Sequence, residues 1–333
     1  MALHPAVAGV RLAVRQALAG HPIETPVLVA CSGGADSLAL AAATIFDCSR
    51  TGRSAGLVTV DHGLQSGSAA QAQRVAALGR ELGFDPVSVS VLVVQVGVTG
   101  GPEGAARTAR YLALDEARRA VAGTASPLVL LGHTADDQAE TVLLGLGRGS
   151  GPRSIAGMRP SGGGYLRPLL GLRRADTAAA CEALGLSCWQ DPQNLDPRFR
   201  RVRLRHEVLP LLDEVLDGGV VGALARTARL LQDDVDALDE IAGQVLAGAV
   251  APDGLPVTSV AGQPVAVRSR VLKRWVEAGG VTGLTAMHVA ELGRLVTHWR
   301  GQGPIDLPGG YRVRRSSGTL GLTAPVAMPP PAP

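Results

Sequence analysis

A glycine-rich loop at residues 32–37 has the composition of a phosphate-binding site. It follows an apolar run and precedes a helical pattern, so its backbone amides and the start of the helix would form a cradle for anions. Two serines add hydroxyl donors, and Asp36 suits a magnesium ion that bridges phosphates. The residues of this loop are Ser32, Gly33, Gly34, Ala35, Asp36 and Ser37. A tight strand–helix turn with a Ser/Asp cap would explain the same residues without a ligand.

A second polar group, GHTADDQAET at residues 132–141, also follows an apolar run. Asp136 and Asp137 suit the start of a helix, where a carboxylate caps the backbone and complements the helix dipole. Capping does not explain Glu140, which lies three residues after Asp137 on the same helix face. Two neighbouring carboxylates are costly unless a cation lies between them. We therefore expect this group to bind a cation, and an ammonium group would suit.

Arginines form two further groups. Arg107 and Arg110 are three residues apart and lie near one helix face, and residues 198–206 hold five arginines and no acid. The net charge of the whole chain is only +3, so this local cluster is the better indication of a phosphate-bearing partner. For any single arginine, a solvated helix with neighbouring charge pairs is the competing interpretation.

The first 150 residues alternate short apolar runs, at 26–31, 56–60, 86–94 and 127–131, with helical patterns at 36–46, 67–82 and 104–121. Runs without clean alternation are typical of strands buried on both faces. The order predicts an α/β fold, a Rossmann-like, doubly wound parallel sheet. Ligands of such sheets bind beyond the carboxyl ends of the strands. Asp61 and His62 follow the second run and belong to this edge, although a turn would also explain Asp61.

The second half of the chain has a different pattern. Residues 148–170 are rich in Gly, Pro and Ser and predict a loop or flap. Helices are expected from about Arg173, including an arginine-rich one that ends at Leu209-Pro210. Three later helices are expected at 219–247, 265–276 and 286–298, a β-hairpin at 307–322 and a disordered Pro-rich tail. We expect a catalytic domain at 1–215, a small C-terminal helical and hairpin domain at 216–325, and the tail at 326–333.

Composition narrows the class of protein. Apolar residues make up 46% and charged residues 18%, which excludes disorder of the whole chain. No run approaches the roughly 18 apolar residues of a membrane span. Arg11 and Arg15 interrupt the apolar N-terminus, which predicts an amphipathic helix and not a secretory signal. The four cysteines form no CxxC pair, which favours a reducing cytoplasm over a disulfide framework.

The string VLVACSGGADSLAL at 27–40 resembles the PP-loop of the N-type ATP pyrophosphatases. That resemblance implies cleavage of ATP between the α and β phosphates. Further strings resemble the tRNA(Ile)-lysidine synthetase family within this group: VDHGLQSGS at 60–68, the order Glu103, Ala106-Arg107 and Arg110-Tyr111, and GHTADDQAET followed by RGSG. A last composite at 188–212, beginning CWQDPQN, resembles the second signature of the family.

The resemblance implies a ligase reaction in the cytoplasm. ATP with Mg²⁺ adenylates the C2 oxygen of the wobble cytidine in tRNA(Ile) with a CAU anticodon, and the ε-amine of free L-lysine then displaces AMP. The product, lysidine, changes the tRNA from methionine to isoleucine specificity. Homologues of this kind can form homodimers. No membrane partner is expected.

The resemblance also assigns roles to residues. The loop residues 32–37 with Asp61 and His62 are implied to bind ATP, and Asp36 is the candidate magnesium ligand. The lysine substrate is implied to bind at Asp136, Asp137 and Glu140. Catalytic roles are implied for Asp36, Asp137 and Arg205. A further role at the α-phosphate is implied for an arginine of the segment 102–119, for which Arg107 and Arg110 are both candidates. Contacts with tRNA are expected from Arg148, Arg198, Arg200, Arg201 and Arg203.

One departure and three alternatives accompany this interpretation. Val202 stands where the family pattern has Asn, so no side-chain amide acts there. A tRNA thiolase would need a sulfur carrier, yet only Cys31 lies beside the loop. An amidotransferase-type synthetase would need a glutaminase domain, for which the chain has no room. A non-catalytic ATP-binding module would keep the loop without needing Asp137, Glu140 and Arg205. We expect the chain to lack a further C-terminal domain found in longer family members. Residues 268–274 and 311–315 are then candidates for acceptor-stem contact, with plain surface charge as the alternative.

Overall fold

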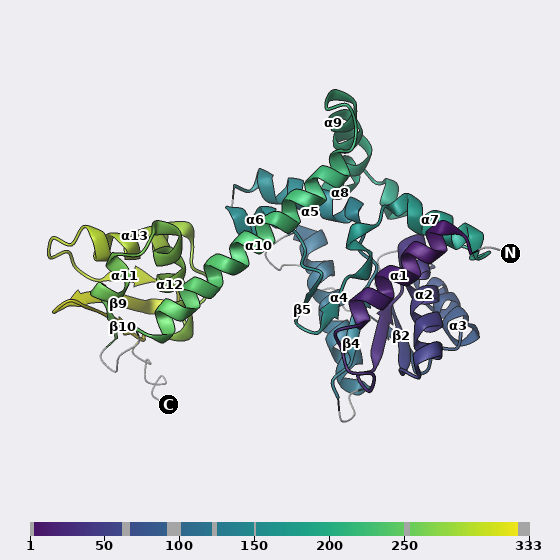
Figure 1. Cartoon of the computed structure of the whole chain (residues 1–333), viewed down its shortest axis with the longest axis horizontal. Helices are drawn as coiled ribbons and strands as arrows, with labels where there is room; N and C mark the ends of the chain where they lie inside the picture. Colours follow the sequence, from purple (N-terminus) through teal and green to yellow (C-terminus); the bar gives the residue numbers. More distant parts are fainter. Residues whose placement is uncertain are drawn as a thin grey trace, which may run out of the picture. The chain divides into compact units, whose positions relative to one another are not determined.

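The computed structural model describes residues 3–61, 67–91, 101–121, 125–149, 151–249 and 254–325, with the backbone alone for 91 and 101–106. The chain divides into two compact units, Met1–Leu231 (unit 1) and Gln232–Pro333 (unit 2). The helix α10, Val220–Ala247, begins in unit 1 and continues into unit 2 (Figure 1). None of the helices in these ranges has the length and apolarity to cross a membrane.

Unit 1 is built on a six-stranded sheet in the order β3-β2-β1-β4-β6-β5. All neighbouring pairs are parallel except β5 with β6. The strands are β1 (Val27–Ala30), β2 (Ala55–Asp61), β3 (Val87–Val91), β4 (Leu128–Leu131), β5 (Ser161–Gly162) and β6 (Tyr165–Leu166). Val27, Leu28 and Val29 of the central strand are all buried, as expected of a strand covered on both faces. The predicted α/β fold with a parallel sheet is confirmed.

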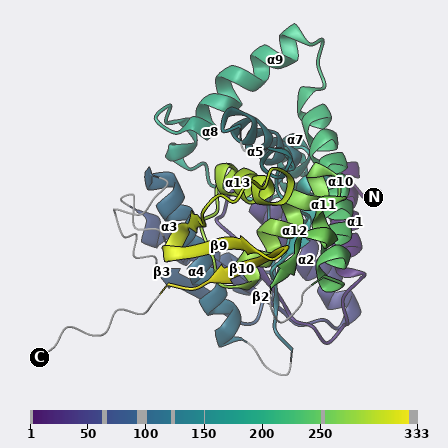
Figure 2. The same cartoon turned by 90° about the vertical axis from the view of Figure 1, so that its left-hand side faces the viewer.

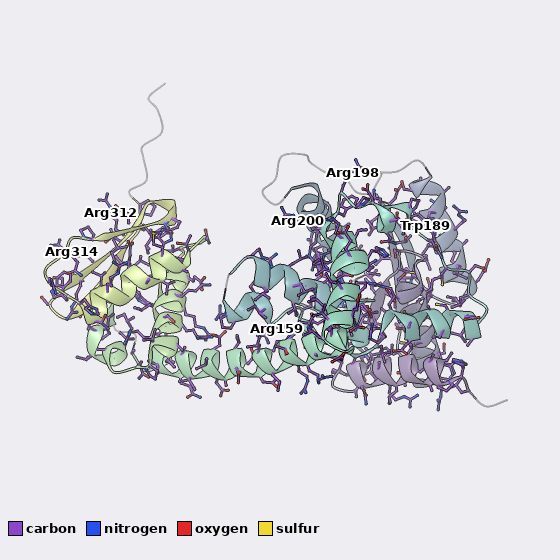
Figure 3. All side chains as sticks on the ribbon, turned by 90° about the horizontal axis from the view of Figure 1, so that it is seen from above. Arg159, Trp189, Arg198, Arg200, Arg312 and Arg314 are labelled. Carbon is purple, nitrogen blue, oxygen red and sulfur yellow. The ribbon has the colours of Figure 1, made fainter. Side chains whose placement is uncertain are left out.

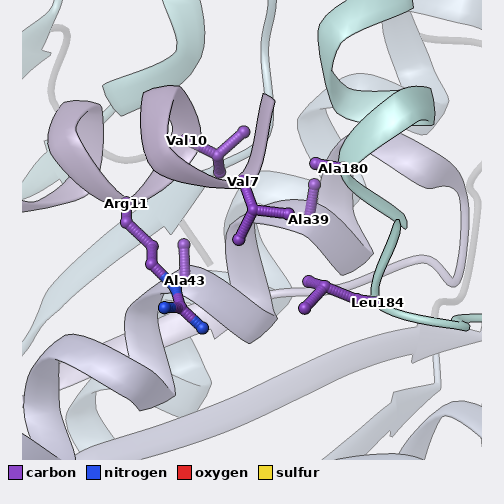
Figure 4. A pocket seen from close by; sticks show the side chains of 7 residues that line it. All are labelled: Val7, Val10, Arg11, Ala39, Ala43, Ala180 and Leu184. Carbon is purple, nitrogen blue, oxygen red and sulfur yellow. The ribbon is translucent and has the colours of Figure 1, made fainter. Parts of the chain in front are cut away.

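Helices follow the strands and cover the sheet. The helices of unit 1 before the shared α10 are α1 (Pro5–Leu18), α2 (Ala35–Thr51), α3 (Ser68–Glu81), α4 (Gly101–Ala120), α5 (Ala135–Gly147), α6 (Pro152–Ile155), α7 (Arg174–Ala183), α8 (Arg200–Arg203) and α9 (Leu209–Val215). Figure 4 shows Val7 and Val10 of α1 against Ala39 of α2 and Ala180 of α7. The predicted amphipathic helix at the N-terminus is therefore confirmed as α1, and it fixes α7 beside α2.

The predicted loop at 148–170 contains more structure than its composition indicates. It includes α6, the hairpin of β5 and β6, and a 3₁₀ turn, η1, at Pro168–Gly171. Tyr165 and Leu166 are buried and extend the parallel sheet beside Val129 and Leu130 of β4. A two-residue strand is too short to leave a periodic pattern, so the glycines around it dominated the prediction.

The arginine-rich helix does not end at Leu209-Pro210, contrary to the sequence-based expectation. A 3₁₀ turn, η2 (Pro192–Leu195), precedes it, and the helix continues through α8, the π-helical turn η3 (Leu204–Val208) and α9. Proline lacks an N–H and its ring collides with the carbonyl four residues earlier. A π turn is wider, and here the Leu209 N–H bonds to the Leu204 carbonyl. The helix thus absorbs Pro210 and places Arg205 within the widened turn.

Unit 2 contains a four-stranded antiparallel sheet in the order β7-β10-β9-β8. Its elements after α10 are β7 (Leu255–Pro256), α11 (Val257–Ala261), α12 (Val265–Ala278), α13 (Ala286–Thr297), β8 (Ile305–Leu307), the turn η4 (Pro308–Gly310), β9 (Tyr311–Ser316) and β10 (Thr319–Thr323). Figure 2 shows β9 and β10 side by side, as the predicted hairpin requires. Leu255, Leu272, Leu292 and Leu320 are fully buried and form the centre of a separate core.

Candidate active site

The glycine-rich loop joins β1 to α2 at the carboxyl edge of the sheet. Gly33 has a φ of +86°, and a Cβ there would lie 2.6 Å from Gln71 Nε2 and 2.8 Å from Val75 Cγ2. Gly34 is the N-cap of α2. The N–H of Trp189 donates to the Gly33 carbonyl over 2.9 Å. Only glycine fits at position 33, so the loop keeps its amides at the helix start, where an anion binds best.

The two serines of the loop contact each other. Ser37 Oγ donates to the Gly34 carbonyl at 2.9 Å and accepts from the Ser32 N–H at 3.2 Å. Cys31 Sγ lies 3.6 Å from the same Ser37 Oγ. Burial raises the pKa of the Cys31 thiol. A thiol held neutral in this way is a poor nucleophile, which argues against a sulfur carrier at this position.

Asp36 lies in the first turn of α2 and faces α7. Its carboxylate accepts a hydrogen bond from the Thr177 hydroxyl and lies 3.4 Å from Arg174 Nε. Burial raises the pKa of Asp36, while the Thr177 hydrogen bond and the charge of Arg174 oppose that rise. Asp36 therefore belongs to a charged network as well as to the phosphate loop.

Asp137 and Glu140 face that network from α5. Asp137 Oδ2 accepts from the N–H and hydroxyl of Thr134 at 2.8 and 3.0 Å, which makes it the capping residue that its position predicts. Its other oxygen lies 2.7 Å from Arg174 Nη2. Glu140 is fully buried and accepts from Arg205 Nε at 2.8 Å. Burial raises the pKa of Glu140, and Arg205 opposes that rise.

Guanidinium groups lie between these carboxylates, where the sequence predicts a cation. Arg174 Nη2 reaches both Asp137 and, at 3.8 Å, Glu140, and Arg205 Nη2 lies 3.8 Å from Asp137. Arg201 Nη1 lies 3.5 Å from the second oxygen of Glu140. We call this group the carboxylate–arginine cluster; its members are Asp36, Asp137, Glu140, Arg174, Arg201 and Arg205.

Asp136 is separate from this cluster. It accepts from Arg173 Nε at 3.1 Å and from the Arg174 backbone N–H at 2.8 Å. Burial raises the pKa of Asp136, but these two bonds outweigh it and the pKa is lowered. The three carboxylates of α5 expected to share a site thus divide: Asp137 and Glu140 belong to the cluster, and Asp136 contacts Arg173 and Arg174 at the start of α7.

Sequence reasoning missed Arg174. The signal that identifies it is its position, because Arg173 and Arg174 stand at the N-cap and the first residue of α7. The helix dipole disfavours cations at a helix N-terminus. Two consecutive arginines there need nearby carboxylates, and α2 and α5 supply them.

A second group of arginines lies around His133 and Tyr111. Arg107 Nη2 and Arg167 Nη2 donate to the Tyr111 hydroxyl at 3.3 and 3.1 Å. Burial lowers the pKa of Arg110, and the charge of Arg107 lowers it further. The pKa of His133 is lowered to about 4, mainly by burial. The charge of Asp137 opposes this shift, and the charges of the nearby arginines add to it. Excess positive charge of this kind suits a phosphate group. We call Arg107, Arg110 and Arg167 the basic cluster.

The arginines expected to contact tRNA do not behave alike. Arg198 is 86% exposed and pairs with Asp196, and Arg203 is 60% exposed and pairs with Glu207. Arg200 is also exposed (Figure 3). Arg201 instead turns inward to Glu140, and Arg148 donates to Ser154 Oγ at 3.4 Å. The arginines of α8 and η3 therefore divide into two groups. Arg200 and Arg203 are exposed to solvent, whereas Arg201 and Arg205 contact Glu140 inside the site.

Of the remaining predicted residues, Asp61 lies at the same edge of the sheet, and the others lie outside the residues that the structure describes. Asp61 is buried at the end of β2, beside β1. His62, the side chain of Glu103 and the Pro-rich tail lie outside the described residues.

Comparison with known proteins decides the family. Residues 12–212 match the model of the PP-loop domain, and residues 255–320 match that of the TilS substrate binding domain. The tRNA(Ile)-lysidine synthase of Thermobifida fusca is 53% identical and covers 96% of this chain and 98% of its own. That of Salinispora tropica is 54% identical over 98% and 99%. The chain belongs to the tRNA(Ile)-lysidine synthase family. The predicted family, enzyme class and fold are confirmed.

A solved structure adds a likeness of fold. The U34-tRNA thiolase NcsA from Methanococcus maripaludis, with its [4Fe-4S] cluster, superposes with a TM-score of 0.53 at 18% identity. It covers 68% of this chain and 80% of its own. At that identity the likeness concerns the fold alone. Lysidine synthase relatives, by contrast, match across both units, so thiolation is not favoured.

Proposed function

We propose that the phosphate loop, the carboxylate–arginine cluster and the basic cluster form one active site for joining lysine to tRNA(Ile). Members of the tRNA(Ile)-lysidine synthase family form lysidine at the expense of ATP, and this chain is such an enzyme. The proposal concerns the substrates and the residues that act at each step. It assigns free L-lysine as the amine and the CAU wobble cytidine as the acceptor.

ATP binds with its phosphates on the loop at residues 32–37, and Asp36 holds the accompanying magnesium ion. The donor set fits a metal of this kind. Asp36 is a single carboxylate beside an anion cradle, and magnesium prefers one or two carboxylates together with substrate phosphates and water. Among the described side chains, no group of three or more His, Cys, Asp or Glu could hold a metal by itself. The ion, when bound, neutralises phosphate charge.

In the first step, the C2 oxygen of the cytidine attacks the α-phosphorus of ATP, and pyrophosphate leaves. Negative charge develops on the phosphate oxygens, and fixed guanidinium groups stabilise it at little cost in reorganisation. We assign this role to Arg107 and Arg110 of α4, and the hydrogen bonds of Arg107 and Arg167 to one Tyr111 hydroxyl support the inclusion of Arg167. Extruding a wobble base from an anticodon loop costs little, because the base is already unpaired.

In the second step, the ε-amine of lysine attacks C2, and AMP leaves. Asp137 and Glu140 hold the ammonium form, and one of these carboxylates accepts a proton from it so that the neutral amine can attack. The amine loses a second proton to solvent as the C–N bond forms and the C2–O bond to AMP breaks. The observation that best supports this proposal is a single ion-pair network. It contains Asp36, Asp137, Glu140 and Arg205, which come from three separate segments of the chain. A module that only binds nucleotide needs no such network.

The test is pyrophosphate release with ATP, magnesium, lysine and an unmodified CAU tRNA(Ile) transcript, each omitted in turn. The RNA is then digested and its nucleosides weighed by mass spectrometry. We expect release to need both tRNA and lysine, and one cytidine to gain the mass of lysine less water. If pyrophosphate is released at the same rate with and without lysine, the assignment of lysine as the amine is wrong, and thiolation is favoured. Nucleotide binding without turnover would favour a binding module.

A further inference from the structure

Arg174 contacts the carboxylates that both small substrates need. Its Nε lies 3.4 Å from Asp36 of the phosphate loop, and its Nη2 lies 2.7 Å from Asp137. In the proposed function, Asp36 serves the nucleotide and Asp137 serves lysine. One guanidinium therefore lies between the two binding places and is attached to both.

The carboxylate–arginine cluster has no unpaired negative charge with which to bind a cationic substrate. Three carboxylates, Asp36, Asp137 and Glu140, are matched by three guanidinium groups, those of Arg174, Arg201 and Arg205. A lysine ammonium group that enters this balanced network brings an unmatched positive charge. Like charges at close range disfavour such entry, so one arginine has to leave its carboxylate first.

Arg174 is the arginine that can leave at least cost. Arg205 and Arg201 each pair with a different oxygen of Glu140, which is fully buried and would be left charged without them. Removing one partner of a buried ion pair is strongly unfavourable. Arg174 contacts Glu140 only at 3.8 Å, and its main partners, Asp36 and Asp137, are 22% and 16% exposed.

A destination for Arg174 lies close by. Its partner Asp36 belongs to the loop that would hold the phosphates, so a bound nucleotide places phosphate oxygens next to this guanidinium. Arginine binds phosphate in a bidentate way, as it binds carboxylate. A magnesium ion at Asp36 would also repel the guanidinium from that carboxylate.

We propose that Arg174 is an exchangeable counter-ion that couples the two small substrates. In the free enzyme it neutralises Asp36 and Asp137; when ATP binds, it transfers to the phosphates and leaves Asp137 open to the lysine ammonium group. This inference rests on the proposed function and goes beyond it, because it makes nucleotide and lysine bind with positive cooperativity. Arg174 acts here as a positioning residue.

Calorimetric titration of lysine measures this coupling directly. Full-length protein is titrated with and without magnesium and an ATP analogue with a methylene group between the α and β phosphates. For the wild type we expect the analogue to tighten lysine binding by a factor within the usual range of about 5 to 150. Linkage requires lysine to tighten analogue binding by the same factor.

In Arg174→Met the coupling should disappear. Asp137 is then open at all times, so lysine without the analogue should bind more tightly than it does to wild type, and the analogue should change its affinity by less than twofold. Arg173→Met is the matched control, because it removes the neighbouring guanidinium that pairs with Asp136. Its coupling factor should match that of wild type. If Arg174 had only a structural role, Arg174→Met would weaken the binding of both ligands. The ratio of lysine affinities with and without the analogue would then stay as in the wild type.

The outcomes separate this inference from the function on which it rests. Wild-type coupling in Arg174→Met, or no coupling in the wild type, overturns the inference and leaves the active site in place. If lysine binds to no form of the protein, even with the analogue and CAU tRNA present, the lysine site itself is wrong and the inference fails with it. Should Arg174→Met not fold, Arg174→Gln, which still donates hydrogen bonds without a charge, decides by the same ratio.

Discussion

At the scale of single residues, the site depends on buried charge that is nearly all paired. Glu140 has no exposure, yet it contacts three arginines. The desolvation of such a carboxylate is offset only while its partners stay in place. Residues of this kind are therefore expected to affect both stability and chemistry when changed.

Glu140→Gln tests that expectation. The amide keeps the shape of the side chain but leaves Arg205 and Arg201 without their carboxylate, so we expect a loss of about 3 kcal/mol in the free energy of unfolding. Asp136→Asn is the control, since its partner Arg173 is half exposed and such pairs contribute about 1 kcal/mol or less. Urea denaturation measures both variants. Equal losses in the two would mean that burial does not set the energy.

Gly33→Ala tests the phosphate loop. A Cβ at this position meets Gln71 and Val75 at under 3 Å and requires a positive φ, so the loop has to distort. We expect ATP affinity to fall by at least tenfold, which corresponds to about 1.4 kcal/mol. Gly9→Ala in α1, outside the loop, is the control, because a Cβ there would meet nothing within 4 Å. Fluorescent nucleotide binding compares the pair, and equal affinities would contradict the assigned cradle.

His133 predicts a pH dependence of stability. Its folded pKa is about 4 against an ordinary 6.5, so between these values the unfolded chain binds more protons and stability falls as pH falls. The full difference is about 3 kcal/mol. Asp36 and Glu140, whose pKa values are raised, act in the opposite direction, so a variant must isolate the histidine. His133→Gln should lose less stability than wild type between pH 6.5 and 4. Parallel curves would exclude His133 as the cause.

At the scale of elements, the functional side chains are placed by helix ends and by one irregular turn. α2, α5 and α7 begin near one another, and each contributes a charged residue from its first turns. The sequence predicted the first two starts because glycine and aspartate mark them, and its expectation of helices from about Arg173 agrees with the start of α7. It did not predict the π turn, since proline normally indicates that a helix ends.

Pro210→Ala examines what the π turn contributes. With the N–H restored, the helix from Arg200 to Val215 can take regular α geometry, which shifts Arg205 relative to Glu140. We expect kcat to fall by about tenfold, or about 1.4 kcal/mol, while stability is unchanged or higher. Pro264→Ala at the N-cap of α12 in unit 2 is the control and should leave kcat unaltered. Wild-type turnover in Pro210→Ala would mean that the turn is incidental.

At the scale of the whole molecule, the sequence predicted the parallel sheet and named most members of the candidate site, and it missed contacts made between distant segments. The parallel strands and the loop followed from apolar runs and their flanking residues, whereas the order of the strands in the sheet was not predicted. The pairing of Arg174 with Asp36 spans 138 positions along the chain, and no local pattern encodes it. The same holds for β6, whose two residues gain their place from β4 and not from periodicity. Long-range charge pairing and very short strands are set by tertiary structure.

The sheet of unit 2 carries arginines on the exposed face of one of its inner strands, β9. Arg312 and Arg314 of β9 alternate with the buried Val313 and therefore share one exposed face (Figure 3). This strand lies within the match to the substrate binding domain. If each arginine neutralises one tRNA phosphate, changing both to Gln should lower the slope of log affinity against log salt by about 1.4 to 1.8.

That change should act on tRNA binding and not on chemistry. We expect KM for tRNA to rise while kcat at saturating tRNA and KM for lysine stay constant, since β9 and the carboxylate–arginine cluster belong to different units. Arg294→Gln, at an exposed position on α13 of the same unit and outside both candidate tRNA segments, controls for loss of charge alone. Filter binding across a salt series measures the slope. An unchanged slope in the double variant would remove β9 from the tRNA-binding surface and leave the exposed arginines Arg198, Arg200 and Arg203 of unit 1 as its main part.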